Sequence, residues 1–141
     1  MKAATVRNLV KEKSADSEKI TINLGFVDLG QIDLLVSEGF YGNRTDFIRT
    51  AIRNQLGSHA DAVKQAVARK TLVLGLQHFS ADDLRAVKAA KQRLRIRVLG
   101  LASIAHDVSP ELALATIESL DVLGALHASP AVKAALASRL R

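Results

Sequence analysis

Three polar residues alternate with three aliphatic residues in the segment from Lys19 to Leu24. The alternation has a period of two, so Lys19, Thr21 and Asn23 share one face of a predicted β-strand. In the major groove of DNA a lysine can donate to the acceptors of guanine, and an asparagine matches the donor and acceptor of adenine. A threonine adds a hydroxyl and a methyl group. The three side chains are therefore candidates for contacts with base edges of double-stranded DNA.

The opposite face of the same segment is aliphatic and has to be buried. It consists of Ile20, Ile22 and Leu24. One short strand does not stay ordered alone, and its sequence neighbourhood offers no second strand. We therefore expect the same segment of a second copy to pair with it, which makes the protein a homodimer.

Two amphipathic helices are expected after this strand. Apolar residues recur at helical spacing in residues 29–40 and again in residues 47–56. We expect Asp28 to cap the first helix, Phe40 to fill the core at the turn, and Gly57 to end the second helix.

The start of the second helix has the chemistry of a phosphate site. Asn43 is a favourable N-cap residue, and Asp46 occupies the capping-box position three residues later. Free backbone N–H groups and the positive end of the helix dipole attract an anion at such a place. Asn43, Arg44 and Thr45 are thus the candidates for contacts with DNA phosphates.

The order strand, helix, turn, helix resembles the ribbon-helix-helix family of DNA-binding transcriptional regulators. The resemblance rests on KITINL at residues 19–24 and on GNRTDFIRTAIR at residues 42–53, and it covers about residues 18–57. In that family two strands pair antiparallel across the dimer and enter the major groove. The resemblance implies the same roles for the strand and for the helix start as their chemistry does.

A short motif recurs three times in the second half of the chain. Val-Leu-Gly occurs at residues 73–75, 98–100 and 122–124. A serine that can cap a helix follows each copy: Ser80, Ser109 and Ser129. We expect three β/α units with parallel strands and right-handed crossovers. A plain helical bundle over residues 70–141 is the alternative.

The positive charge lies mainly outside the predicted ribbon. The net charge is +6, and residues 58–100 hold nine Lys or Arg against three Asp or Glu, whereas residues 1–57 hold eight against seven. Part of the attraction for phosphate is therefore expected from the middle of the chain. There RLRIRV, residues 93–98, alternates and places its three arginines on one face. Arg49 and Arg53 on the second helix are expected to be a solvated stripe, and contact with the DNA backbone is the alternative.

The chain offers little for catalysis or for metal binding. It has no cysteine, and its four histidines include no pair at helical i, i+4 spacing and no HxH motif. His78 and His127 would lie on the first and third strands with Ser103 between them, about 9 to 10 Å apart, which is too far for one metal ion. We expect no cofactor, no metal, no catalytic residue and no enzymatic activity.

The predicted fold class is α+β, mostly α, and the chain divides into four parts. They are a flexible arm (1–18), a ribbon-helix-helix domain for DNA binding and dimerisation (19–57), a connector helix (58–70) and a β/α repeat domain (71–141). The connector helix is expected to be capped by Ser58. The repeat domain is expected to join dimers into tetramers or larger assemblies, or to contact a protein partner.

The predicted function is sequence-specific regulation of transcription, most simply repression, in the cytoplasm and without a membrane. The alternative is an antitoxin that also represses its own operon, although antitoxin tails are typically disordered until bound. A third hypothesis is a scaffolding protein in which the ribbon only dimerises.

Overall fold

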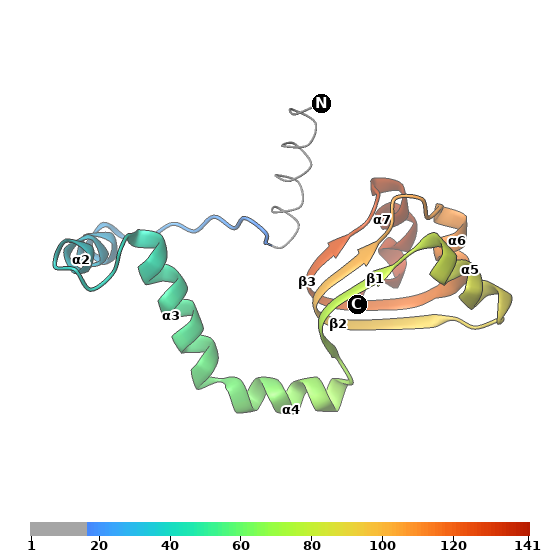
Figure 1. Cartoon of the computed structure of the whole chain (residues 1–141), viewed down its shortest axis with the longest axis horizontal. Helices are drawn as coiled ribbons and strands as arrows, with labels where there is room; N and C mark the ends of the chain where they lie inside the picture. The colour runs from blue at the N-terminus through green and yellow to red at the C-terminus, as the bar shows by residue number, and fades with distance from the viewer. Residues whose placement is uncertain (1–16) are drawn as a thin grey trace. The chain divides into compact units, whose positions relative to one another are not determined.

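The computed structural model describes residues 17–141, which form two compact units that divide between Ala60 and Asp61 (Figure 1). The predicted arm, residues 1–18, falls almost wholly outside the described residues. We call residues 17–60 the N-terminal unit and residues 61–141 the C-terminal unit. The chain is of mixed α/β class, with one three-stranded sheet among its described residues.

The N-terminal unit contains two helices, α2 (Phe26–Ser37) and α3 (Arg44–Ser58). The N-cap of α2 is Gly25, so the expected cap by Asp28 is wrong. Asp28 lies instead in the first turn, where a carboxylate is favoured by the helix dipole. Phe40 is 71% exposed in the turn, so a single chain does not bury it, and its expected core role stays a prediction for the dimer.

Helix α3 runs one residue beyond the expected end at Gly57, and its C-cap is His59. Helix α4 (Ala60–Lys70) follows at once. Ser58 does not cap α4, because it is still helical and its hydroxyl donates to the carbonyl of Gln55 at 2.7 Å. Bonding to a carbonyl one turn back is a common alternative for serine inside a helix.

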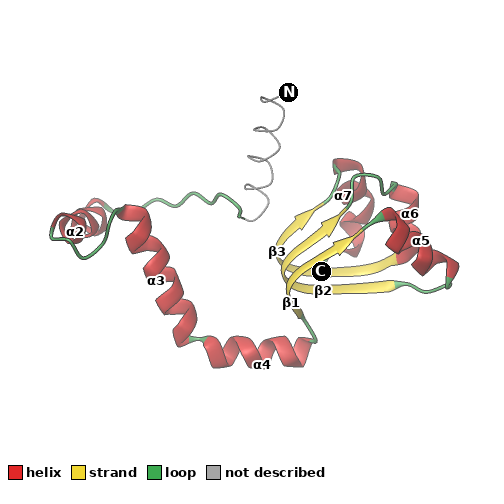
Figure 2. Cartoon of the chain, in the orientation of Figure 1, coloured by secondary structure: helices red, strands yellow, loops and turns green. Residues whose placement is uncertain are grey.

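The segment predicted as a ribbon strand, residues 19–24, has no regular secondary structure and is exposed along its whole length (Figure 2). Ile20 and Ile22 are 74% and 58% exposed. A single chain supplies no second strand for this segment within the described residues. The paired ribbon and the dimer remain predictions.

The C-terminal unit is built from the three β/α units that the repeat predicts, and the helical-bundle alternative is wrong (Figure 2). The strands are β1 (Val73–Phe79), β2 (Leu94–Ile104) and β3 (Ile117–His127). The helices are α5 (Ala81–Ala89), α6 (Pro110–Thr116), α7 (Pro130–Leu136) and the short 3-10 helix η1 (Ala137–Arg139). The strands are parallel in the order β1-β2-β3, and Gly75, Gly100 and Gly124 are level with one another.

One hydrophobic core joins the helices to one face of this sheet. The fully buried large apolar side chains are Leu84, Val98, Ile117, Leu120, Val132 and Leu136. Each such side chain stabilises the fold by roughly 1.5–3 kcal/mol through its removal from water. The unit therefore has a core of its own within a single chain.

The three glycines allow the strands to approach one another at the level of the repeat motif. Their φ angles are +120°, +141° and +122° for Gly75, Gly100 and Gly124, a region that L side chains avoid. A Cβ atom at Gly100 would lie 2.1 Å from the carbonyl oxygen of Gly75, and one at Gly124 would lie 2.1 Å from that of Gly100. Figure 2 shows the three strands bending together midway. We call this row the glycine ladder.

The leucines of the repeat face away from the core. Val98 is fully buried, so strand alternation places Leu99 and Leu101 on the opposite face. On β1 the equivalent residues Leu74 and Leu76 are 70% and 66% exposed. On β2 the motif thus combines a buried valine with a glycine that has an outward leucine on either side.

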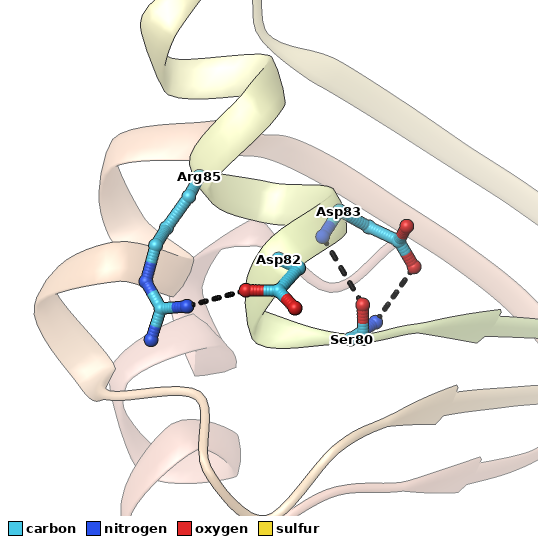
Figure 3. Close-up of polar contacts among 4 residues, drawn as sticks. All are labelled: Ser80, Asp82, Asp83 and Arg85. Carbon is cyan, nitrogen blue, oxygen red and sulfur yellow. Dashed lines mark hydrogen bonds and ion pairs between the residues drawn. The ribbon is translucent and has the colours of Figure 1, made fainter.

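All three predicted serine caps are confirmed. The Ser80, Ser109 and Ser129 hydroxyls accept from backbone N–H groups at 3.1, 3.1 and 3.2 Å. Around Ser80 the capping box is complete, because Asp83 in turn accepts from the Ser80 N–H at 2.9 Å (Figure 3). This hydrogen bond from the Ser80 backbone is the main cause that lowers the pKa of Asp83 below its ordinary 3.8.

Replacement of Gly100, on the central strand, should lower the free energy of unfolding of the C-terminal unit much more than replacement of Gly75, on the edge strand. Gly100→Ala adds a clash with the Gly75 carbonyl to the strain of a positive φ, so we expect the free energy of unfolding to fall by about 3 kcal/mol or more. Gly75→Ala has the same strain but no atom within 4 Å of its new Cβ, and should cost roughly 1–2 kcal/mol. If denaturant titrations show equal losses of unfolding free energy for the two variants, the close backbone contact at Gly100 is contradicted.

The Asp83 capping box should make stability depend on acid pH. Folding lowers the pKa of Asp83 below its ordinary value of 3.8. The contribution of Asp83 to stability is therefore fully present above pH 3.8 and is lost as the pH falls through the pKa of the folded protein. The difference in melting temperature between wild type and Asp83→Asn should therefore be constant near neutrality and shrink below about pH 4. Asp82→Asn is the matched control, because the Asp82 carboxylate pairs with the exposed Arg85 at 2.7 Å and takes no part in the capping box (Figure 3). A difference that does not change with pH would count against the assignment.

Candidate nucleic-acid interface

The unpaired segment before α2 and one side of α3 together line a groove of about 810 Å³. Its lining is Ser17, Glu18, Lys19, Ile20, Ile22, Thr45, Ile48, Arg49, Ile52 and Arg53. The aliphatic members come from both elements, two from the segment and two from α3. The groove is thus apolar where the predicted strand meets the helix and is bordered by cationic side chains.

The predicted base-contacting residues are all exposed, and only one of them lies at the groove. Lys19 is among its lining residues, whereas Thr21 and Asn23 are not. The alternation is followed only in part: Ile20 and Ile22 line the groove and Thr21 between them does not, whereas Lys19 of the polar face lines it and Leu24 of the apolar face does not.

The start of α3 has the predicted cap with one difference. The Asn43 side chain accepts from the Asp46 N–H at 2.8 Å, as expected of an N-cap. The Asp46 carboxylate, however, accepts from the N–H of Gly42 at 2.9 Å, one residue before the cap, so the capping box is not formed. The first backbone bond of the helix runs from Phe47 to Asn43, which leaves the N–H groups of Arg44 and Thr45 without an acceptor inside the helix.

The side chain of Arg44 is engaged within the unit. Its guanidinium donates to both carboxylate oxygens of Asp33 at 2.7 and 2.8 Å, and so joins α3 to α2. These hydrogen bonds hold the pKa of Asp33 below its usual range. Both side chains are about half exposed, so the pair orients the helices more than it stabilises them. A phosphate at this site would share Arg44 with Asp33.

The turn between α2 and α3 is held by an aromatic contact. The rings of Tyr41 and Phe47 meet edge to face with their centroids 5.0 Å apart. Gly39, with φ +85°, lets the chain leave α2. The two features bring the cap of α3 to a defined position relative to α2.

Two further cations of the groove are Arg49 and Arg53, which sequence reasoning assigned to a solvated stripe. Both line the groove on the same side of α3 as Ile48 and Ile52. Each arginine directly follows one of these isoleucines in the sequence. This position directly after an isoleucine of the apolar stripe was the sequence signal that could have identified both arginines as groove residues.

Arg95 and Arg97 of β2 alternate with the buried Ile96 and Val98, as predicted, and these two arginines and Arg93, just before the strand, are each tied to a neighbour. Arg95 pairs with Glu118 at 2.8 Å, and Arg97 donates to the Thr71 hydroxyl at 3.1 Å. Arg93 donates to the carbonyl of Leu114 at 3.3 Å. The excess of positive charge in the middle of the chain thus includes side chains that also support the sheet.

The histidines are placed as the repeat predicts. His78, Ser103 and His127 are level on the three strands, and His78 Nδ1 lies 3.1 Å from the Ser103 hydroxyl. Within residues 17–141 no group of three or more His, Cys, Asp or Glu side chains could hold a metal ion. No helix of this described part is long and apolar enough to cross a membrane.

Comparisons with known proteins extend the resemblance beyond the N-terminal unit. A family model described as the Ribbon-Helix-Helix transcriptional regulator family matches residues 15–133, which includes most of the β/α repeat. No curated protein and no solved structure matches the chain. The matched range covers most of the sequence and both units, and the chain therefore belongs to the ribbon-helix-helix family of transcriptional regulators.

Proposed function

We propose that the protein acts in the cytoplasm as a homodimeric repressor that binds its operator with a paired ribbon of residues 19–24. The observation that carries the proposal is the form of this segment in a single chain. Its isoleucines lie in an apolar groove on α3, while the alternate residues Thr21 and Asn23 lie outside the groove. Such a segment is ready to pair through its backbone and to present its polar face to DNA.

Dimerisation would bury apolar surface that one chain leaves exposed. Phe26 and Val27 are 92% and 72% exposed, and Leu34 and Leu56 are 59% and 61% exposed. Contiguous exposed apolar groups of this kind mark interaction surfaces in soluble proteins. A second copy, whose segment 19–24 pairs antiparallel with the first, would cover the groove and these side chains together.

The proposed contacts with DNA follow from the chemistry of the exposed groups. Lys19, Thr21 and Asn23 would contact base edges in the major groove. Asn43, Arg44 and Thr45 would hold a phosphate, chiefly through the two first-turn N–H groups and the positive end of α3. The groove cations Arg49 and Arg53 would add phosphate contacts that are sensitive to salt. Repression would follow from occupancy of the operator and exclusion of polymerase.

The antitoxin alternative is less favoured because of the C-terminal unit. An antitoxin tail is expected to order only on binding its toxin. Here Leu84, Val98 and Leu136 are completely buried with no partner present. In the scaffolding alternative the protein would not bind DNA even at low salt, so the same binding experiment separates it from a regulator.

The base-contact assignment is tested by footprinting the protein on the DNA upstream of its own gene. Lys19→Ala and Asn23→Ala should each weaken specific binding by about 1–3 kcal/mol and reduce sequence preference. Lys133→Ala is the matched control, because Lys133 is an exposed lysine of α7, outside both the proposed interface and the basic residues 58–100, and it should keep the footprint. Unchanged footprints for both ribbon variants would sink the assignment.

The dimer is tested by a charge on the apolar side of the ribbon. Combined with Leu76→Lys, a charge that blocks association through the outer edge of β1, Ile22→Asp should produce a monomer in sedimentation experiments, because a carboxylate cannot be buried unpaired at the proposed interface. The melting temperature of the C-terminal unit should be unchanged, since Ile22 belongs to the other unit. Thr21→Asp, on the polar face and in the same Leu76→Lys background, is the control and should stay dimeric while losing its binding to DNA. A protein that carries both Ile22→Asp and Leu76→Lys and is still dimeric would refute pairing through residues 19–24.

A further inference from the structure

Within residues 17–141 no strand pairs with the outer edge of β1, and the strand itself carries none of the usual protection against pairing. β1 is at one end of the sheet order, and its sequence VLGLQHF contains no lysine, acid or proline. Val73, Leu74 and Leu76 are 43%, 70% and 66% exposed. Natural edge strands generally carry a charge, a proline or a covering segment, and an unprotected apolar edge is a template for another strand.

The opposite edge of the sheet is covered only in its first part. Leu140 bridges to Leu120 on β3, and the Arg141 N–H donates to the Leu120 carbonyl at 2.8 Å. Beyond that point, within residues 17–141, Val122–His127 has no strand on its outer side. In the register of the sheet, Val122 is level with Val73, the first residue of β1. The open parts of the two edges therefore begin at the same level and can run together to His127 and His78.

The glycine ladder makes the two edges complementary in shape. The carbonyl of Gly75 occupies the place of a Cβ at Gly100, and the carbonyl of Gly100 does the same at Gly124. The corresponding place beside Gly75 is empty, with no atom within 4 Å. Gly124 is on the last strand, so its own carbonyl has no further glycine opposite it. One edge thus has a projecting carbonyl, and the other has the space for it.

We propose that the open edge of β1 binds residues 122–127 of a second copy as a parallel neighbour, with Gly124 of the second copy beside Gly75. The added pair repeats the register of β1 with β2 and of β2 with β3. Leu123 and Ala125 of the second copy come to lie beside Leu74 and Leu76, and the exposed leucine rows continue across the contact. A strand of an unrelated protein would need a glycine of positive φ at the one matching position, whereas this chain already has it.

This contact is head to tail, since it joins different edges of the two copies. Heterologous contacts of this kind close into a ring or continue as an open chain. The inference concerns the C-terminal unit alone and goes beyond the proposed function. If the ribbon dimer is also formed, the contact links neighbouring dimers on DNA and raises their effective concentration for one another.

A pair of engineered cysteines tests the register, because the natural sequence contains no cysteine. Leu76 and Ala125 are both level with Leu101 and lie two strands apart within one chain. At standard strand spacing their Cα atoms are about 9.6 Å apart, too far for a disulfide, whereas the proposed contact brings them to about 4.8 Å between copies. Mild oxidation of full-length Leu76→Cys with Ala125→Cys should therefore produce a ladder of covalent multimers on a non-reducing gel.

The controls separate this contact from other ways of associating. Leu74→Cys with Ala125→Cys is the matched pair one step out of register. The proposed contact leaves the Cα atoms of these two residues roughly 8 Å apart, so this pair should not form covalent multimers. Efficient dimers from Leu76→Cys alone would indicate pairing of β1 with itself or of the leucine faces, and would overturn the proposal. No multimers from the in-register pair would overturn it as well.

A second measurement requires no disulfide and separates this contact from the ribbon dimer. Leu76→Lys places a charge on the exposed edge, so the melting temperature should hold while species larger than a dimer disappear in sedimentation at increasing concentration. The in-register cysteine pair combined with Ile22→Asp should still form the covalent multimers. If Ile22→Asp abolishes all association, the ribbon accounts for the assembly and the edge contact is refuted. If the in-register cysteine pair forms covalent multimers but the otherwise unchanged protein binds no DNA, only the proposed regulatory function fails.

Discussion

The close approach of backbone at Gly75, Gly100 and Gly124 is the constraint on which the C-terminal unit depends. A carbonyl oxygen occupies the volume of a Cβ at two of the three positions, so those positions accept no other residue without movement of the backbone. The ladder sets the strands level with one another. From that register follow the aligned row of repeat valines on one face, of which Val98 is buried, and the outward leucines on the other.

The N-terminal unit is governed by the opposite condition, a lack of internal partners. Its helices are held by a cap at Asn43, an aromatic contact, and the pairing of Arg44 with Asp33. Its apolar side chains, Phe26 and Ile20 among them, remain largely exposed. The two units thus differ physically in that one buries its core within a single chain, and the other has apolar surface that only a second molecule can cover.

The features predicted well from sequence are those that depend on neighbours a few residues away. Serine caps and the two-residue period of strands have local causes, and Ser80, Ser109 and Ser129 all cap as expected. Even local rules failed where a side chain has two possible hydrogen-bond partners nearby. Ser58 bonds back to the Gln55 carbonyl, and the Asp46 carboxylate reaches Gly42 and not the N-cap residue. Phe40 failed for another reason, because its burial depends on what lies across the turn.

The sequence by itself determined the order of the elements, the repeat of Val-Leu-Gly and the likeness to ribbon-helix-helix regulators, since each is written in residue types at short spacing. Only the tertiary structure decided which faces those elements turn to one another. It places the repeat leucines outward, ties Arg44 to Asp33, and brings Arg49 to the groove beside Lys19. The reason is that a side chain's partner across 11 or 25 residues depends on the path of the chain between them. Periodicity records which residues share a face, but not what that face meets.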